Sequence, residues 1–162
     1  MKSFVFILLC FFALAFSGCT DTPRVRMIGS QAQDFTIKDA DRTVSLHDYK
    51  GKIVLLNFWA SWCAPCIEEM PSLLQLQKLM GPKVTVVAVS IDEDANAYHK
   101  FLQDHNVDLL TVRDPQQNTP TMYGTTGWPE TFVIDSSGRI RRKFVGAVNW
   151  TSPDIVDYLN KL

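Results

Sequence analysis

The stretch FWASWCAPCI (residues 58–67) places two cysteines, Cys63 and Cys66, directly after an apolar run. A metal site, a haem attachment, a structural crosslink and a working redox pair all use cysteine pairs of close spacing. The residues before the pair include the unbroken apolar run 53–56, which is typical of a strand covered on both faces. The residues after it repeat apolar side chains at helical spacing over 64–80. The cysteines are therefore predicted at the junction of a central strand and a helix N-terminus.

Strands and helices alternate from residue 33 onward, which predicts an α/β fold with a central mixed sheet flanked by helices. Further strands are expected at 35–37 and 44–46, as an N-terminal β-hairpin, and at 84–89, 131–134 and 140–145. Further helices are expected at 94–105, capped by Asp94, and from Ser152-Pro153 onward.

Length and charge limit the classes of protein to consider. The chain has 162 residues, a near-average apolar fraction of 46% and a formal net charge of -1. This length suits one domain with a proper hydrophobic core. Lys and Arg are scattered rather than clustered, so the chain lacks the basic patch that a nucleic-acid backbone requires.

The N-terminal residues have the composition of an export signal. The apolar run 4–16 is shorter than the ~20 residues of a membrane span, and the small residues 17–18 follow it. We therefore expect a signal peptide over 1–18. A small-residue pair before a cysteine resembles the lipobox of bacterial lipoproteins, which implies a lipid on Cys19 and a lipidated tether over 19–32. Secretion without a lipid is the alternative.

Export would leave Cys63 and Cys66 as the only thiols of a domain at 33–162. Zinc needs four ligands, and the three histidines fall in no ligand pattern beside a single cysteine pair. No metal and no other cofactor are therefore expected. Haem attachment requires a histidine directly after the second cysteine, where this chain has Ile67.

A structural crosslink and a redox pair remain. Closing a four-residue loop removes only about 2 kcal/mol of unfolded-state entropy, which a domain of this size does not need. At a helix N-terminus, unpaired N–H groups and the helix dipole favour a thiolate over a thiol. The thiolate is the attacking species in disulfide exchange. This favours Cys63 as the nucleophile and Cys66 as the residue that resolves the mixed disulfide.

Residues 57–66 resemble the active-site segment of the thioredoxin superfamily. The longer pattern, with Asp34-Phe35, Lys50-Gly51-Lys52 and Glu69-Met70-Pro71, is similar to the tethered envelope reductases of the TlpA, ResA and CcmG (DsbE) group. The similarity covers essentially all of 33–162. It implies a thioredoxin-like fold with a central helical insertion and the activity of a thiol-disulfide oxidoreductase.

The resemblance also implies a proton acceptor. Thioredoxins have a buried Asp six residues before the first cysteine, where this chain has Asn57, which cannot titrate. The envelope group carries an acidic residue facing the cysteines in its insertion, and this place matches Glu93, with Asp92 as the second choice. A carboxylate held beside a buried thiol would have a raised pKa suited to moving protons. The alternative is a solvated acidic start to the helix that Asp94 caps.

A client-binding surface is implied by the segment 127–132. In the superfamily the proline at the place of Pro129 is cis and lies against the cysteine pair, which exposes the backbone of Trp128 to a substrate strand. Trp62 and Trp128 would flank the pair as apolar contacts, although both could be ordinary core residues. Glu130 resembles the CcmG branch, whose members reduce apocytochrome c cysteines.

The expected protein is therefore a membrane-anchored reductase on the periplasmic side of the cell envelope. Its implied partners are client proteins with disulfides and a membrane electron donor of the CcdA or DsbD kind. Ile67 stands where relatives often have Arg or Lys, and Glu68 follows it, so the redox potential stays open.

Two other functions are compatible with this fold. A thiol peroxidase needs Thr or Ser three residues, and Pro seven residues, before the reactive cysteine, where this chain has Ala60 and Leu56. A Cu(I)-delivery module would use the two thiols as soft ligands. Its relatives have a wider cysteine spacing and a partner histidine, which this chain lacks.

Overall fold

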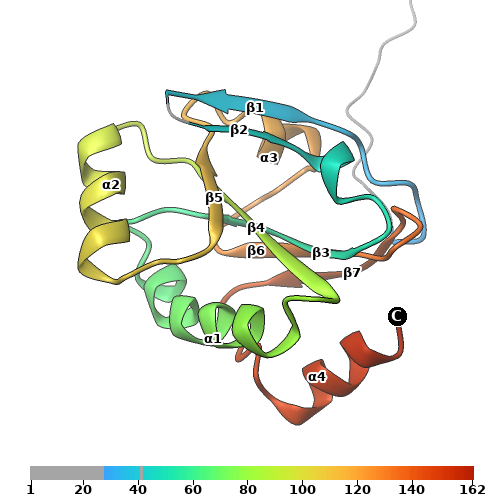
Figure 1. The fold of residues 1–162 in the computed structure, drawn as a ribbon. Helices are drawn as coiled ribbons and strands as arrows, with labels where there is room; N and C mark the ends of the chain where they lie inside the picture. The colour runs from blue at the N-terminus through green and yellow to red at the C-terminus, as the bar shows by residue number, and fades with distance from the viewer. Residues whose placement is uncertain (1–27, 41) are drawn as a thin grey trace, which may run out of the picture.

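The computed structural model describes residues 28–40 and 42–162 (Figure 1). The expected signal peptide and Cys19 lie outside the described residues. The strands are β1 (Thr36–Asp39), β2 (Arg42–Ser45), β3 (Ile53–Trp59), β4 (Val84–Ser90), β5 (Leu110–Arg113), β6 (Glu130–Ile134) and β7 (Ile140–Val145). The helices are α1 (Ala64–Met80), α2 (Ala95–Asp104), α3 (Asn118–Met122) and α4 (Pro153–Asn160), with a 3-10 turn at Leu46–Tyr49.

The central sheet is mixed and has the strand order β5-β4-β3-β6-β7. Strand β3 runs parallel to β4 and antiparallel to β6, and β1 and β2 form a separate hairpin. In Figure 1 helices α1 and α4 lie below the sheet, while the hairpin and α3 lie above it. The predicted α/β fold and its N-terminal hairpin are confirmed.

Strand β3 is buried along its whole length because both faces of the sheet are covered. Leu55 and Trp59 pack with the helix side of the core, and Leu56 and Phe58 pack with the hairpin side. This alternation follows from the period of two along a strand. Each such side chain stabilises the fold by about 1.5–3 kcal/mol when fully buried. An unbroken apolar sequence is therefore what this position requires.

One strand and one α-helix were not predicted from the sequence. Strand β5 has four residues, and only two of them are buried. Helix α3 has five residues and follows Gln117, which has a positive φ of 55°. A residue before the helix stabilises its first turn, because the backbone N–H of Thr119 donates to the carboxylate of Asp114 at 2.7 Å. Neither element is long enough to carry a periodic apolar pattern.

Residues 28–32, in the segment expected to be tether, are hydrogen-bonded to the folded core. The N–H of Gly29 donates to the carbonyl of Ile140 at 2.6 Å, and that of Ala32 donates to the carbonyl of Gly138 at 2.8 Å. This contact lies at the end of the sheet where β3 begins. In the part of the chain that the structure describes, no helix has the length and hydropathy to span a bilayer.

The opposite end of the sheet collects three segments of the sequence. Strands β3 and β4 both end there, because Trp59 is in register with Ser90. Strand β6 begins there, since Glu130 lies opposite Phe58. The loops after β3, after β4 and before β6 therefore meet, and they carry the predicted site residues.

Candidate active site

Cys63 and Cys66 form a disulfide at the start of α1, with their Cα atoms 5.2 Å apart. Cys63 is the N-cap residue, and its sulfur accepts the backbone N–H of Cys66 at 3.3 Å. Pro65 follows in the first turn, where a proline costs no helical hydrogen bond. Cys63 is 7% exposed and Cys66 is 2% exposed. The predicted junction of strand and helix N-terminus is confirmed, and Cys63 is the more accessible sulfur.

A buried carboxyl group lies one helical turn beyond Cys66. Glu69 is 2% exposed, and its Oε1 accepts from the indole Nε1 of Trp150 at 2.6 Å and from the amide of Asn57 at 3.3 Å. Its Oε2 accepts the backbone N–H of Val148 at 3.3 Å. Burial raises the pKa of Glu69 from 4.5 to about 7, although the hydrogen bonds from Trp150 and Val148 partly oppose this rise.

Glu69 is the functional candidate that sequence reasoning missed. Residues three apart on a helix lie on the same face, so its carboxyl group is on the face of Cys66. Asn57, at the position of the thioredoxin aspartate, donates to this carboxyl group. The buried acid thus comes from α1 instead of β3. The spacing of three residues between Cys66 and Glu69 is the sequence signal that could have indicated this role.

The acidic segment after β4 begins with the buried Asp92, and the two acids that follow it, Glu93 and Asp94, are exposed. Asp92 is 2% exposed and accepts from the N–H of Ser61 at 3.0 Å, its hydroxyl at 2.7 Å, and the hydroxyl of Ser90 at 2.6 Å. It thereby holds the loop that leads to Cys63. Glu93 is exposed, and its backbone carbonyl accepts from Arg113 at 3.1 Å. Asp92, the second choice, is thus the buried acid of the two. A proton-transfer role for Glu93 or Asp92 stays a prediction.

The loop before β6 contains the predicted cis-proline. The Trp128–Pro129 bond is cis, as expected, and the carbonyl of Pro129 accepts the N–H of Gly146 at 2.9 Å. Trp128 is half-buried and packs against both halves of the core. Trp62, directly before Cys63, is 64% exposed. Of the two tryptophans, Trp62 is the one that presents an apolar surface to solvent.

Glu130 lies beneath the surface instead of on it. Its side chain is fully buried and forms an ion pair with Lys143, with Oε1 and Nζ 2.9 Å apart. Its other oxygen accepts the N–H of Thr126 at 3.5 Å. The expectation of direct client contact does not fit this burial, because β7 supplies a cation that occupies the carboxylate. Glu130 can influence a client only through the loop that it holds.

Across residues 28–40 and 42–162, no three His, Cys, Asp or Glu side chains are grouped so that they could hold an ion. What the arrangement offers chemically is a sulfur pair at a helix N-terminus, a buried acid beside it and an exposed aromatic surface.

Solved structures of similar fold and the curated relatives define the class: this is a thioredoxin-like protein and a thiol-disulfide oxidoreductase. A Chlorobium tepidum structure with the provisional name thiol:disulfide interchange protein DsbE is 33% identical, has a TM-score of 0.74, and matches 84% of this chain and 94% of that one. The structure of a DsbF homologue from Corynebacterium diphtheriae is 31% identical with a TM-score of 0.69, over 85% of this chain and 87% of that one.

Within that class, the chain belongs to the Redoxin family, whose model matches residues 27–162. Thiol-disulfide oxidoreductase ResA of Geobacillus thermodenitrificans is 34% identical over 83% of this chain and 78% of the relative. ResA of Bacillus subtilis is also 34% identical, over 82% of this chain and 74% of the relative. The protein is a thiol-disulfide oxidoreductase of the ResA/DsbE kind, as the sequence predicted.

Proposed function

We propose that this protein reduces disulfides in specific client proteins outside the cytoplasm, with Cys63 as the attacking and Cys66 as the resolving residue. The observation that carries this assignment is the hydrogen bond from the N–H of Cys66 to the sulfur of Cys63 at the first turn of α1. The same donor and the helix dipole stabilise the Cys63 thiolate when the pair is reduced. Cys66 lies inside the helix instead of at its N-cap, and it is also the more buried of the two cysteines.

The reaction is a two-electron exchange. The Cys63 thiolate attacks one sulfur of the client disulfide, so that a mixed disulfide forms and the other client sulfur leaves as a thiolate. The Cys66 thiolate then attacks the sulfur of Cys63 and releases the second client thiolate. The client is reduced, and the Cys63–Cys66 disulfide of the structure is the oxidised product.

Cys66 has to lose its proton during this reaction, and we assign its acceptance to Glu69. A general base works best when its pKa lies near the working pH. Burial gives Glu69 a pKa of about 7, and its position one turn from Cys66 puts both groups on one helix face. The exposed Glu93 has no comparable setting.

The client class is inferred from the loop before β6. Glu130, directly after Pro129, resembles the CcmG branch, so we propose clients with a pair of cysteines such as apocytochrome c. The exposed indole of Trp62 would contact apolar residues beside the client disulfide, and the half-buried Trp128 would border them. The client segment would bind in an extended conformation, because the backbone of Trp128 forms a short edge to which a strand can hydrogen-bond.

Anchoring and recharging complete the proposal. A lipid on Cys19 would hold the protein on the periplasmic side of the cell envelope. A reductant in an oxidising compartment must be reduced again, which requires a membrane electron donor of the CcdA or DsbD kind.

Trapping tests this function directly. The Cys66→Ser variant cannot resolve the mixed disulfide, so it should accumulate a covalent adduct with the client in cells. Cys63→Ser is the matched control and should trap nothing, because the first attack on the client needs the sulfur of Cys63. A reduction potential of about -120 mV, at the oxidising end of the range known for thiol-disulfide oxidoreductases, would contradict a reducing role.

A further inference from the structure

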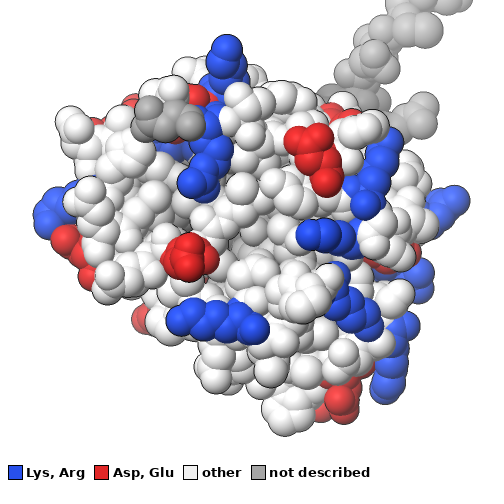
Figure 2. Space-filling view, in the orientation of Figure 1, with Lys and Arg blue, Asp and Glu red and all other residues white. Residues whose placement is uncertain are grey.

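Exposed cations gather at the end of the molecule that is farthest from the disulfide. We define the basal face by Lys50, Lys52, Lys83 and Arg139, all of which are exposed. Lys52 directly precedes β3, and the cysteine pair follows that strand. Seven residues of strand span about 20 Å, which separates this face from the active site. Figure 2 shows Lys and Arg gathered along this end of the molecule (right).

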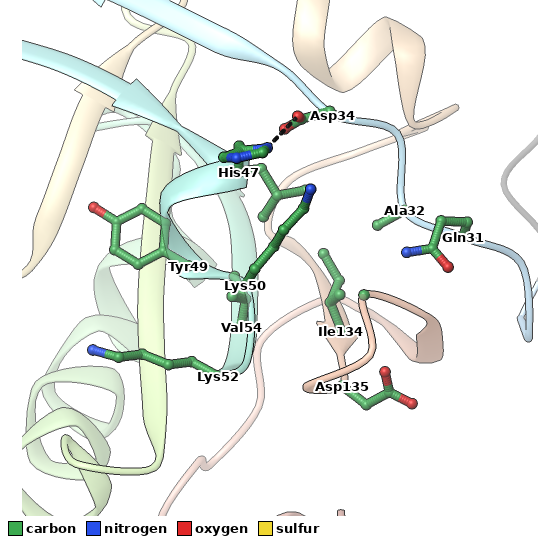
Figure 3. A pocket seen from close by; sticks show the side chains of 12 residues that line it. Gln31, Ala32, Asp34, His47, Tyr49, Lys50, Lys52, Val54, Ile134 and Asp135 are labelled. Carbon is green, nitrogen blue, oxygen red and sulfur yellow. Dashed lines mark ion pairs between the residues drawn. The ribbon is translucent and has the colours of Figure 1, made fainter.

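Two hollows connect the three lysines of the basal face. The first, of about 190 Å³, is lined by Gln31, Lys50 and Lys52 among others. Figure 3 shows the side chain of Lys50 extending along this hollow and that of Lys52 pointing away from it. The second hollow, of about 380 Å³, brings Lys52 together with Lys83 and Leu162. Lys52 lines both hollows, so the three lysines belong to one surface instead of two.

The carboxylates near this face are mostly engaged with other groups. Asp34 lies 3.7 Å from His47, and Asp135 forms an ion pair with Arg141 at 3.1 Å. Asp48 is exposed in the 3-10 turn. Lys83 donates to the carbonyl of Asn160 and Arg139 to that of Gly29, and neither bond neutralises the cation. The basal face therefore has a surplus of positive charge.

The chain also leaves the described fold at this face. Ile28 is 64% exposed, and the neighbouring Gly29 is fixed to Ile140. Cys19 precedes Ile28 by nine residues, which span at most about 30 Å when fully extended. A lipid on Cys19 would keep the basal face within this distance of a bilayer. Leu79, in the last turn of α1 and four residues before Lys83 in the sequence, is an apolar side chain that is 62% exposed.

We propose that the basal face binds the surface of an anionic lipid bilayer and holds the disulfide on the side away from the membrane. This inference rests on the proposed lipid anchor at Cys19. Positive side chains next to an anionic membrane are attracted by its surface potential, which extends about one Debye length. The lipid anchor limits the distance between the domain and the bilayer, and the cations turn the basal face toward the membrane.

Vesicle binding tests the face without the lipid. The mature chain, residues 19–162 with Cys19→Ser, contains every described residue. It should sediment with vesicles of phosphatidylglycerol and phosphatidylcholine but not with phosphatidylcholine alone, at about 50 mM salt, where screening is weak. Each cation near such a surface contributes about fivefold in affinity. Lys50→Gln/Lys52→Gln should therefore weaken binding by about tenfold to thirtyfold.

The matched control is Lys38→Gln/Lys100→Gln, which removes the same charge from exposed positions on β1 and α2. It should change vesicle binding by less than about twofold, since its charges lie outside the face. Equal losses in both pairs, or no binding of the parent chain, would overturn the proposal. If the parent chain does not bind vesicles and Lys50→Gln/Lys52→Gln is reduced more slowly than the parent by the membrane electron donor, the basal face is a surface for a protein and the proposal is wrong. None of these outcomes depends on client trapping by Cys66→Ser.

Discussion

The buried carboxyl group of Glu69 should make the oxidised protein less stable as the pH rises from about 4.5 to about 7. In the unfolded chain this group loses its proton near its ordinary pKa of 4.5, whereas burial raises the pKa in the folded protein to about 7. Below 4.5 both states hold the proton and the full stability is present. Above 7 the folded protein must bury a carboxylate. At about 1.4 kcal/mol for each pKa unit, the loss is about 3 kcal/mol.

Urea denaturation of the oxidised protein at several pH values between 4 and 8 measures this loss. Glu69→Gln removes the titrating group, so its free energy of unfolding should vary with pH by about 3 kcal/mol less than that of the parent. The substitution also alters the contacts with Trp150 and Val148, which adds an offset that does not depend on pH.

Glu68→Gln is the control for this experiment. Glu68 is the neighbouring acid on α1 and is exposed, so its loss should leave the pH profile of the parent unchanged. Parallel profiles for the parent and Glu69→Gln would show that Glu69 ionises in the folded protein as it does in the unfolded chain. The reasoning from burial would then be refuted, together with the assignment of Glu69 as proton acceptor.

Three further predictions concern the surroundings of the disulfide. Lys143→Met leaves the carboxylate of Glu130 buried without its cation and should lower the free energy of unfolding by about 3 kcal/mol; addition of Glu130→Gln should recover part of that loss in urea denaturation. A single variant as stable as the parent would contradict the importance of the pair. Ser61→Ala removes a hydroxyl donor to Asp92 and should cost about 1–2 kcal/mol, measured in the same way; an unchanged midpoint would show that the backbone N–H alone holds the loop. Trp62→Ala should change stability by no more than about 0.5 kcal/mol, because the side chain is exposed, while the KM for a client disulfide rises severalfold. An unchanged KM would remove Trp62 from the client surface.

Patterns of local sequence were sufficient for the framework of this protein. The unbroken apolar run of β3 predicts a central strand because burial on both faces leaves no polar position. The helical spacing after the cysteines predicts α1, and the two together place Cys63 at a helix N-terminus. The resemblance to the envelope reductases added Pro129, whose cis bond no spacing rule reveals.

The environment of the site depends on tertiary packing. Glu69 and Glu68 are adjacent acids in one helix, yet Glu69 is buried and hydrogen-bonded to Trp150 while Glu68 is exposed. Asp92 is likewise buried while its neighbour Glu93 is exposed. The buried Glu130 forms an ion pair with Lys143, which lies on another strand. Local sequence was enough to place the cysteines at the start of a helix, because strand and helix periods are local. Which carboxyl groups lose water could be seen only in the folded molecule, since desolvation depends on segments far away in the chain.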